Sequence, residues 1–177
     1  MLKTFMAFSL CMACIGGTSA AESEREPFDD RYCTTCHGTD GRGNEGVQAP
    51  RLAGMEPWYL RRQLENFRGD IRGVHAEDRE GIAMRPMATK LTDESIDDIL
   101  GWISSWDYIP AEATVKGGDP LRGRDLYSGC AVCHGADATG NESLGAPALA
   151  GQNDWYLVTQ LKNFLAGYRG AHPNDTY

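Results

Sequence analysis

Apolar residues near the middle of the chain recur at the spacing of one helix face. The positions i, i+3, i+4 and i+7 of this stripe are Ile96, Ile99, Leu100 and Ile103. Thr92 precedes the stripe and is a favoured N-cap residue. Asp93 and Glu94 come next, in the first turn, where the helix dipole stabilises acidic side chains. The pattern therefore predicts an amphipathic helix that begins just after Thr92.

A second apolar face lies earlier in the chain and has clear boundaries. Pro57 suits the first position of a helix, and Gly69 suits its end. The apolar face between them consists of Trp58, Leu60, Leu64 and Phe67. A third, short helix is predicted from Asp119-Pro120 through residues 126–127 into the segment 130–134. No stretch alternates polar and apolar residues as a strand does, so we predict an all-α fold.

Two pentapeptides of the form C-x-x-C-H give the strongest chemical signal in the sequence. Their cysteines and histidines are Cys33, Cys36, His37, Cys130, Cys133 and His134. Two thiols at this spacing can each form a thioether with one vinyl group of the same porphyrin, and the adjoining histidine then ligates the iron. The pairs could instead form disulfides or bind zinc, but neither role requires a histidine after each pair. The motifs therefore predict two covalently bound haem c groups.

The start of the chain predicts export. Lys3 supplies a positive charge, residues 5–15 are mostly apolar, and small residues lead to a cleavage position after Ala20 or the next residue. The apolar stretch is too short to cross a bilayer as a helix. We therefore predict a signal peptide over residues 1–20, a periplasmic location, and no transmembrane segment after cleavage. A lipid anchor on Cys14 is less favoured, because the residues before it are a poor lipidation context.

The composition narrows the choice of partners. The formal net charge is -8 at pH 7. A negative net charge disfavours binding to nucleic acid and to anionic membrane surfaces, and it fits docking to a protein with a basic rim around its binding site. Glycine accounts for 21 of the 177 residues, which suits short helices joined by tight loops around a large prosthetic group.

The second half of the chain repeats the first at an offset of 97 residues, with about half of the aligned positions identical. Trp58-Tyr59-Leu60, for example, matches Trp155-Tyr156-Leu157. We predict two tandem domains, over residues 21–109 and 119–177, joined by a linker over 110–118. Domains of this size bury a limited core, so a porphyrin would supply much of their apolar interior.

The first domain offers four candidates for a second ligand opposite His37, namely Met55, Met84, Met87 and His75. Met84 and Met87 lie in the sequence M-R-P-M, whose proline predicts an extended loop before the last helix. We assign Met84 and keep Met87 as the runner-up, with a plain core role as the alternative. A methionine ligand raises the potential relative to two nitrogen ligands. His75, which recurs as His172, would give a bis-histidine site, although we favour a surface or loop role for it.

Two further pairs of residues have matching positions in both copies. Pro50 and Pro147 each lie thirteen residues after the histidine of their motif. Each carbonyl could accept a hydrogen bond from that imidazole, which would fix the orientation of the ring and make it a more electron-rich ligand. The alternative is that both prolines only turn the chain. Arg72 and Arg169 could pair with haem propionates, but a solvated surface position is at least as frequent.

With these motifs, the repeated Ala-Pro-x-Leu-Ala-Gly segments and M-R-P-M in place, the mature chain resembles class I cytochromes c. More narrowly, it resembles the two-haem periplasmic cytochromes c of the c-four group. The resemblance implies two all-helical domains that face each other, each with histidine and methionine on its iron. It assigns the thioethers to both cysteine pairs and the iron ligands to His37, Met84 and His134.

The second copy departs from this pattern at its end. The equivalent of Met84 would lie about four residues beyond Tyr177, so we expect the chain to be a fragment. A complete chain would leave the second iron five-coordinate, ligated by His172, or never stably loaded.

The favoured hypothesis is a one-electron carrier in a respiratory chain, not an enzyme. The resemblance implies redox partners such as a terminal oxidase, a quinol-oxidising complex or a dehydrogenase. One alternative is a haem subunit bound tightly to a dehydrogenase. Another is a peroxidase-like enzyme that uses an open position on the second iron, which is least favoured because no distal acid–base group is evident.

Overall fold

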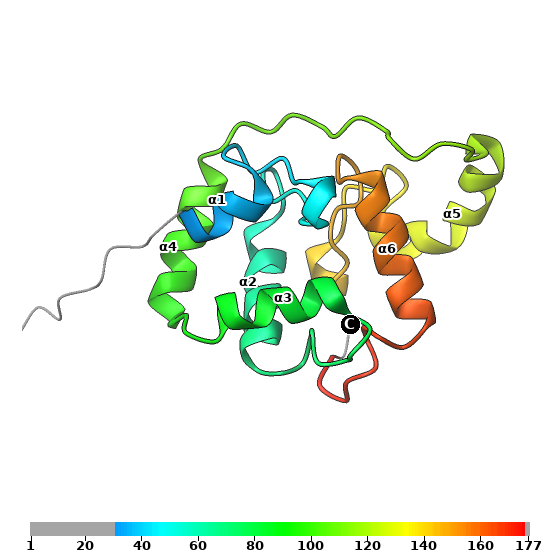
Figure 1. Ribbon diagram of the computed structural model, residues 1–177. Coiled ribbons are helices and arrows are strands. Elements are labelled where there is room, and N and C mark those ends of the chain that lie inside the picture. Colours follow the sequence, from blue (N-terminus) through cyan, green and yellow to red (C-terminus); the bar gives the residue numbers. More distant parts are fainter. Residues whose placement is uncertain (1–30, 176–177) are drawn as a thin grey trace, which may run out of the picture.

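The structure is a computed structural model that describes residues 31–175, so the predicted signal peptide lies outside it. Its helices, with η for a 3-10 turn, are α1 (Arg31–His37), η1 (Glu45–Val47), α2 (Pro57–Arg68), α3 (Arg79–Ala88), α4 (Asp93–Ser104), α5 (Pro120–His134), η2 (Glu142–Leu144) and α6 (Asp154–Leu165). Figure 1 shows α1 to α4 grouped on one side and α5 and α6 on the other, with an extended segment passing between them.

The prediction of an all-α fold is confirmed. Over residues 31–175 the only extended pairings are two isolated antiparallel bridges, Asn44 with Ala49 and Asn141 with Ala146. None of the helices in this range is long and apolar enough to cross a membrane.

The core of the first domain forms where α2 meets α4. Leu60 of α2 is buried together with the whole predicted stripe of α4, which comprises Ile96, Ile99, Leu100 and Ile103. Ile96 at the centre is 0% exposed. Because burying one such side chain contributes roughly 1.5–3 kcal/mol, this stripe is the main apolar anchor of α4. The periodicity of the sequence therefore predicted the packing face correctly.

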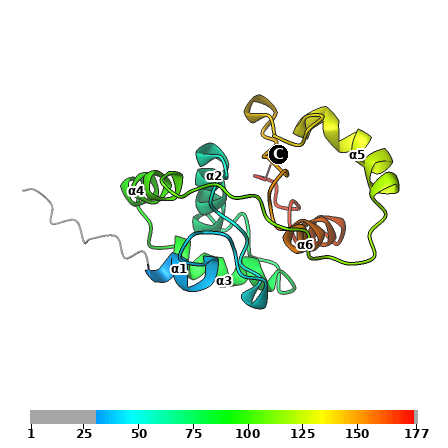
Figure 2. The same ribbon diagram turned by 90° about the horizontal axis from the view of Figure 1, so that it is seen from above.

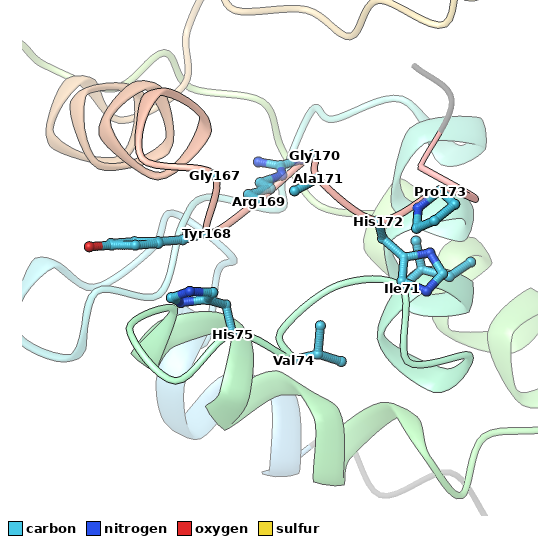
Figure 3. Close-up of a pocket in the computed structure, with 10 residues that line it drawn as sticks. All are labelled: Ile71, Val74, His75, Gly167, Tyr168, Arg169, Gly170, Ala171, His172 and Pro173. Carbon is cyan, nitrogen blue, oxygen red and sulfur yellow. The ribbon is translucent and has the colours of Figure 1, made fainter.

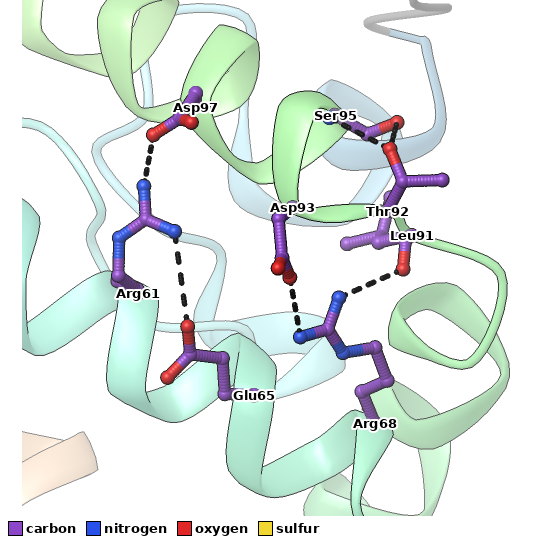
Figure 4. Close-up of polar contacts among 8 residues, drawn as sticks. All are labelled: Arg61, Glu65, Arg68, Leu91, Thr92, Asp93, Ser95 and Asp97. Carbon is purple, nitrogen blue, oxygen red and sulfur yellow. Dashed lines mark hydrogen bonds and ion pairs between the residues drawn. The ribbon is translucent and has the colours of Figure 1, made fainter.

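Polar contacts fix the start of α4 against the end of α2 (Figure 4). Thr92 caps α4 as predicted, since its hydroxyl accepts a hydrogen bond from the backbone N–H of Ser95 at 3.2 Å. Arg68, the last residue of α2, donates to the Leu91 carbonyl at 3.0 Å and to the Asp93 carboxylate at 2.7 Å. These bonds hold the chain where it turns into α4.

The segment 84–87 does not form the loop that the proline predicted. It lies within α3, and Pro86 occupies the last turn of that helix. Asp78 caps the helix by accepting from the Gly81 N–H at 3.2 Å, and both Gly81 and Ala88 are buried. Pro86 lacks only one N–H, late in the helix, so the cap and the packing outweigh its local preference.

The second domain begins with α5 as predicted. Pro120 is its first residue, and the Asp119 carboxylate accepts from the N–H groups of Leu121 and Arg122 at 3.0 and 3.1 Å. The helix continues without interruption to His134, through residues 126–127 and into the segment 130–134 as predicted. Figure 2 shows α5 curving around the side of this domain, with α6 nearer the first domain.

The segment between α4 and α5 is held to the second domain by Asp154 at the start of α6. The Asp154 carboxylate accepts from the N–H groups of Thr114 and Val115 at 2.7 and 2.8 Å. Burial acts to raise the pKa of Asp154, but the hydrogen bonds from Val115 and Thr114 outweigh it, and the pKa lies below its usual value. The linker is therefore anchored most firmly when this carboxyl group is ionised.

A buried arginine joins the two domains. Arg72 donates to Gln63 Oε1 at 2.6 Å in its own domain. It also donates to the Tyr156 hydroxyl and to Gln160 Oε1, both at 3.1 Å, in the second domain. Arg72 is only 7% exposed, so the alternative of a solvated surface position does not hold for it. One guanidinium thus needs acceptors from both domains.

Arg169 makes the reciprocal contacts from the other side. It donates to Gln160 Oε1 at 2.7 Å, and to the Tyr59 hydroxyl and Gln63 Oε1 at 3.1 Å each. Each arginine thus bonds to the glutamine of its own domain and to the tyrosine and the glutamine of the other domain. Because the two sets of contacts are equivalent, the interface is self-complementary.

The two arginines also affect the Tyr156 hydroxyl between the domains. Burial acts to raise the pKa of Tyr156, but the guanidinium groups of Arg72 and Arg169 outweigh it, and the pKa lies below its usual value.

We predict that Tyr156→Phe lowers the free energy of unfolding by about 1–2 kcal/mol, because it leaves a buried guanidinium N–H without its acceptor. Urea unfolding of the haem-loaded protein, followed by circular dichroism, measures the effect. Tyr168→Phe is the matched control, since the Tyr168 ring stacks on His75 and its hydroxyl lies outside the arginine network. Equal unfolding midpoints for the two variants would contradict the assigned role.

We predict that Asp154→Asn loosens the linker at neutral pH and has no effect in strong acid. The folded-state pKa lies below the ordinary value of 3.8, so the carboxylate contributes stability above about pH 4 and loses it as the pH falls through the folded-state value. Thermal unfolding of both proteins at pH 7 and at about pH 2 measures the difference. A difference that grows towards acid would contradict the prediction.

Candidate haem sites

Each C-x-x-C-H motif lies at the end of a helix. Cys33 and Cys36 lie in α1, which ends at His37, and Cys130 and Cys133 lie in α5, which ends at His134. Residues three apart lie on the same side of a helix, so both thiols of a pair can reach one flat group. The four cysteines form no disulfide with one another, and over residues 31–175 no group of three His, Cys, Asp or Glu side chains could hold a metal ion.

The two motif histidines make the hydrogen bonds that the sequence predicted. His37 Nδ1 lies 2.7 Å from the Pro50 carbonyl, and His134 Nδ1 lies 2.8 Å from the Pro147 carbonyl. A carbonyl oxygen can only accept, so Nδ1 carries the proton in each ring. The lone pair is therefore on Nε2, where an iron ligand needs it. The predicted hydrogen bonds to the two proline carbonyls are confirmed, and their effect on an iron ligand stays a prediction.

A small closed loop places each of these carbonyls. In the first domain, Asn44 and Ala49 exchange two backbone hydrogen bonds of 2.7 and 3.1 Å just before Pro50. The N–H of Gly43 donates to the His37 carbonyl at 2.9 Å and ties the loop to α1. The second domain repeats both features with Asn141, Ala146, Gly140 and His134. The position of each imidazole is thus set by backbone bonds within its own domain.

Burial favours the neutral imidazole in the first domain. His37 is 5% exposed, and burial lowers its pKa below the ordinary value, against the opposing effect of the Pro50 hydrogen bond. A neutral ring with Nδ1 protonated is the form that ligates a metal. His134 is half-buried and has the same hydrogen-bond geometry.

Other features of the chain fit a haem. Arg51 is 2% exposed, yet its Nε and Nη1 have no hydrogen-bond partner. Buried guanidinium donors are stabilised by an anion, and a haem has two propionate groups.

The exposed apolar residues of α5 also fit a haem. Leu121, Leu126 and Val132 are exposed, and no residue of the helix is buried. These apolar side chains are suited to cover a porphyrin face.

Both candidate methionines lie on α3. Met84 is half-buried, whereas Met87 is 45% exposed. The sequence predicted an extended loop for these residues, whereas they lie in a helix. The assignment of Met84 as the axial ligand stays a prediction.

The recurring histidines lie in loops at the domain boundary, as expected for His75. The His75 ring stacks on Tyr168 with centroids 4.5 Å apart and is exposed. His75 and His172 both line a cavity with a volume of 310 Å³. Figure 3 shows His172 beside Ile71, on the side of this cavity opposite His75. In each ring Nδ1 accepts a backbone N–H, from Glu77 at 3.2 Å and from Asn174 at 3.1 Å.

Sequence reasoning missed three groups that matter for the two sites. Arg51 follows directly after Pro50, and its position beside a predicted carbonyl could have marked it. Glu56 and Asn153 occupy the same position in the two copies, and both side chains bond across the interface. Nothing in a single sequence indicates that the two domains meet at this position.

Comparison with known proteins is consistent with this geometry. A family model described as cytochrome c matches residues 25–107 and again residues 121–175. A thiosulfate dehydrogenase electron acceptor of Stutzerimonas stutzeri (strain A1501) is 34% identical over 155 residues, which is 81% of this chain and 67% of that protein.

Two solved structures share the tandem arrangement. The cytochrome c4 of Acidithiobacillus ferrooxidans aligns with a TM-score of 0.67 at 27% identity, over 80% of this chain and 84% of that one. A thiosulfate dehydrogenase (TsdBA) of Marichromatium purpuratum aligns with a TM-score of 0.64 at 32% identity. That alignment covers 77% of this chain but only 30% of the enzyme chain.

Proposed function

Because the chain belongs to the cytochrome c family, whose domain it carries twice, we propose that it carries single electrons in the periplasm from a dehydrogenase to a respiratory chain. It is a class I, dihaem electron-transfer protein with two covalently bound haem c groups, and not an enzyme in its own right. The compartment, the partners and the residues that hold the haems are the proposed parts.

The observation that supports the proposal is the same site built twice. We assign the thioethers to the cysteines of both motifs and the proximal ligands to His37 and His134. The hydrogen bonds to Pro50 and Pro147 hold each imidazole with Nε2 available. A bound haem supplies an iron that changes between Fe(III) and Fe(II) and so accepts or releases one electron. The shared arginines Arg72 and Arg169 hold the two sites in one body for transfer between them.

Similarity to an electron acceptor of a dehydrogenase, and to part of a dehydrogenase chain, favours a dehydrogenase as the electron donor. The net charge of -8 suits a donor with a basic docking rim, and such encounters are weakened by salt. A tightly bound dehydrogenase subunit is the second candidate, supported by the same similarities.

Electron transfer with isolated partners tests the proposal. The haem-loaded protein is mixed with a reduced thiosulfate dehydrogenase, and in a second experiment the reduced protein is mixed with membranes containing a terminal oxidase. We expect second-order transfer in both, with rates that fall as salt rises through about 0.1 M. Reversible redox behaviour without transfer to or from either partner would exclude the carrier role, and stable co-purification with a dehydrogenase would favour the subunit.

The axial ligand of the first haem is tested separately. We predict that Met84→His lowers the midpoint potential of one haem, because nitrogen replaces sulfur on the iron. The far-red absorption of a sulfur-ligated ferric haem should also be lost from that site. Met87→Ala is the control and should change neither property. The reverse result, with loss only in the Met87 variant, would move the ligand to Met87.

A further inference from the structure

The two residues that precede α2 and α6 reach across the interface instead of capping their own helices. Glu56 and Asn153 occupy the N-cap positions, and neither side chain makes a cap hydrogen bond. Asparagine is among the most favoured N-cap residues, so this use of it is unusual. Asn153 Oδ1 instead accepts from the N–H of Arg51, and Glu56 Oε1 from the N–H of Ala148, both at 2.8 Å.

These N–H groups belong to the peptide units that hold the motif histidines. The carbonyl of the Pro50–Arg51 peptide accepts from His37, while the N–H of the same peptide donates to Asn153. One peptide group thus connects the imidazole of the first domain to a side chain of the second. The reciprocal chain of bonds consists of His134, the Pro147–Ala148 peptide and Glu56.

Hydrogen bonds through one peptide group strengthen each other. When the N–H donates to a strong acceptor, the carbonyl oxygen gains electron density and accepts more strongly. A stronger acceptor at Nδ1–H makes Nε2 a better electron donor to the iron. A more electron-rich ligand stabilises the oxidised iron and lowers the potential of that site.

The two chains of hydrogen bonds end at acceptors of different charge. Asn153 is a neutral amide, and its Nδ2 also donates to the Arg42 carbonyl at 3.3 Å. Glu56 is a carboxylate, and its Oε2 is buried without a hydrogen-bond partner. Hydrogen bonds to an ionised acceptor are roughly twice as strong as those between neutral groups. The peptide at Ala148 is therefore polarised more strongly than the peptide at Arg51.

Two glycines make the approach possible. Gly43 and Gly140 have φ values of +87° and +86°. A Cβ at Gly140 would lie 2.8 Å from Glu56 Oε1, and a Cβ at Gly43 would lie 2.6 Å from Asn153 Oδ1. Any other residue at these positions would push the acceptor side chain away from the peptide. The contact is thus built into both copies of the loop.

We propose that each domain tunes the iron ligand of the other through these peptide groups, with Glu56 lowering the potential of the His134 site below the value that a neutral acceptor would give. Glu56 and Asn153 are positioning residues that act through His134 and His37. The inference rests on the proposed function, because it takes these histidines as the iron ligands.

The test uses the full, haem-loaded protein and two complementary substitutions. Glu56→Gln keeps the side-chain shape and removes the charge, and Asn153→Asp adds a charge at the equivalent position. Potentials are measured by spectroelectrochemical titration, and hyperfine-shifted proton resonances followed during stepwise oxidation assign each potential to its haem. The Nδ1–H resonance of each histidine gives a second readout, which is independent of electron transfer to partners.

We expect Glu56→Gln to raise the potential of the His134 site alone and Asn153→Asp to lower that of the His37 site alone. The expected size is a roughly three- to tenfold change in the ratio of reduced to oxidised haem at fixed applied potential. This corresponds to about 30 to 59 mV for a one-electron couple. The Nδ1–H resonance of the same histidine should move with the potential.

Asp154→Asn is the control for charge alone, since it removes a carboxylate next to Asn153 that bonds only to the linker and its own helix. Equal shifts at both haems, or a shift in Glu56→Gln no larger than in Asp154→Asn, would overturn the inference. Normal histidine ligation with unmoved potentials overturns it while leaving the proposed function intact. Spectra without histidine on the iron would instead contradict the proposed function itself.

Discussion

Two guanidinium groups that must find acceptors in both domains control the arrangement of this molecule. Burying a charge is costly unless hydrogen bonds compensate it, and the buried Arg72 and the half-buried Arg169 both take acceptors from the opposite domain as well as from their own. Each takes one glutamine from its own domain, and a tyrosine and a glutamine from the other. This exchange brings α2 and α6 together. The residues just before these helices then lie against the opposite histidine loops.

Features that depend on neighbouring residues were predictable from the sequence. The cap at Thr92, the buried stripe of α4 and the start of α5 after Asp119 each follow from a few adjacent side chains. The histidine-to-proline hydrogen bonds were predictable because the spacing of thirteen recurs in both copies. The loop predicted around Pro86 was wrong, because the cap by Asp78 and the burial of Ala88 lie outside the local preference of proline.

The interface was not predictable in the same way. The repeat shows that Arg72 has an equivalent in Arg169, but it does not show that each bonds to residues of the other copy. That relation depends on how the two domains meet, which no local pattern encodes. The sequence did contain a usable signal, since an arginine, a glutamine and a tyrosine recur together at matching positions. Polar residues that recur in an otherwise helical repeat are candidates for contacts between its copies.

Duplication alone would give two equivalent sites, so differences beside the histidine loops decide how the sites diverge. The first loop carries Arg51 where the second carries Ala148, and a buried guanidinium favours the electron-rich, reduced form nearby. The second loop faces Glu56 where the first faces Asn153, and a carboxylate favours the oxidised form. If the haems are bound as proposed, both differences act in the same direction, since each would favour the reduced form at the first site over the second. With the proposed haem assignment, the contacts across the interface would therefore favour electron transfer from the His134 site to the His37 site.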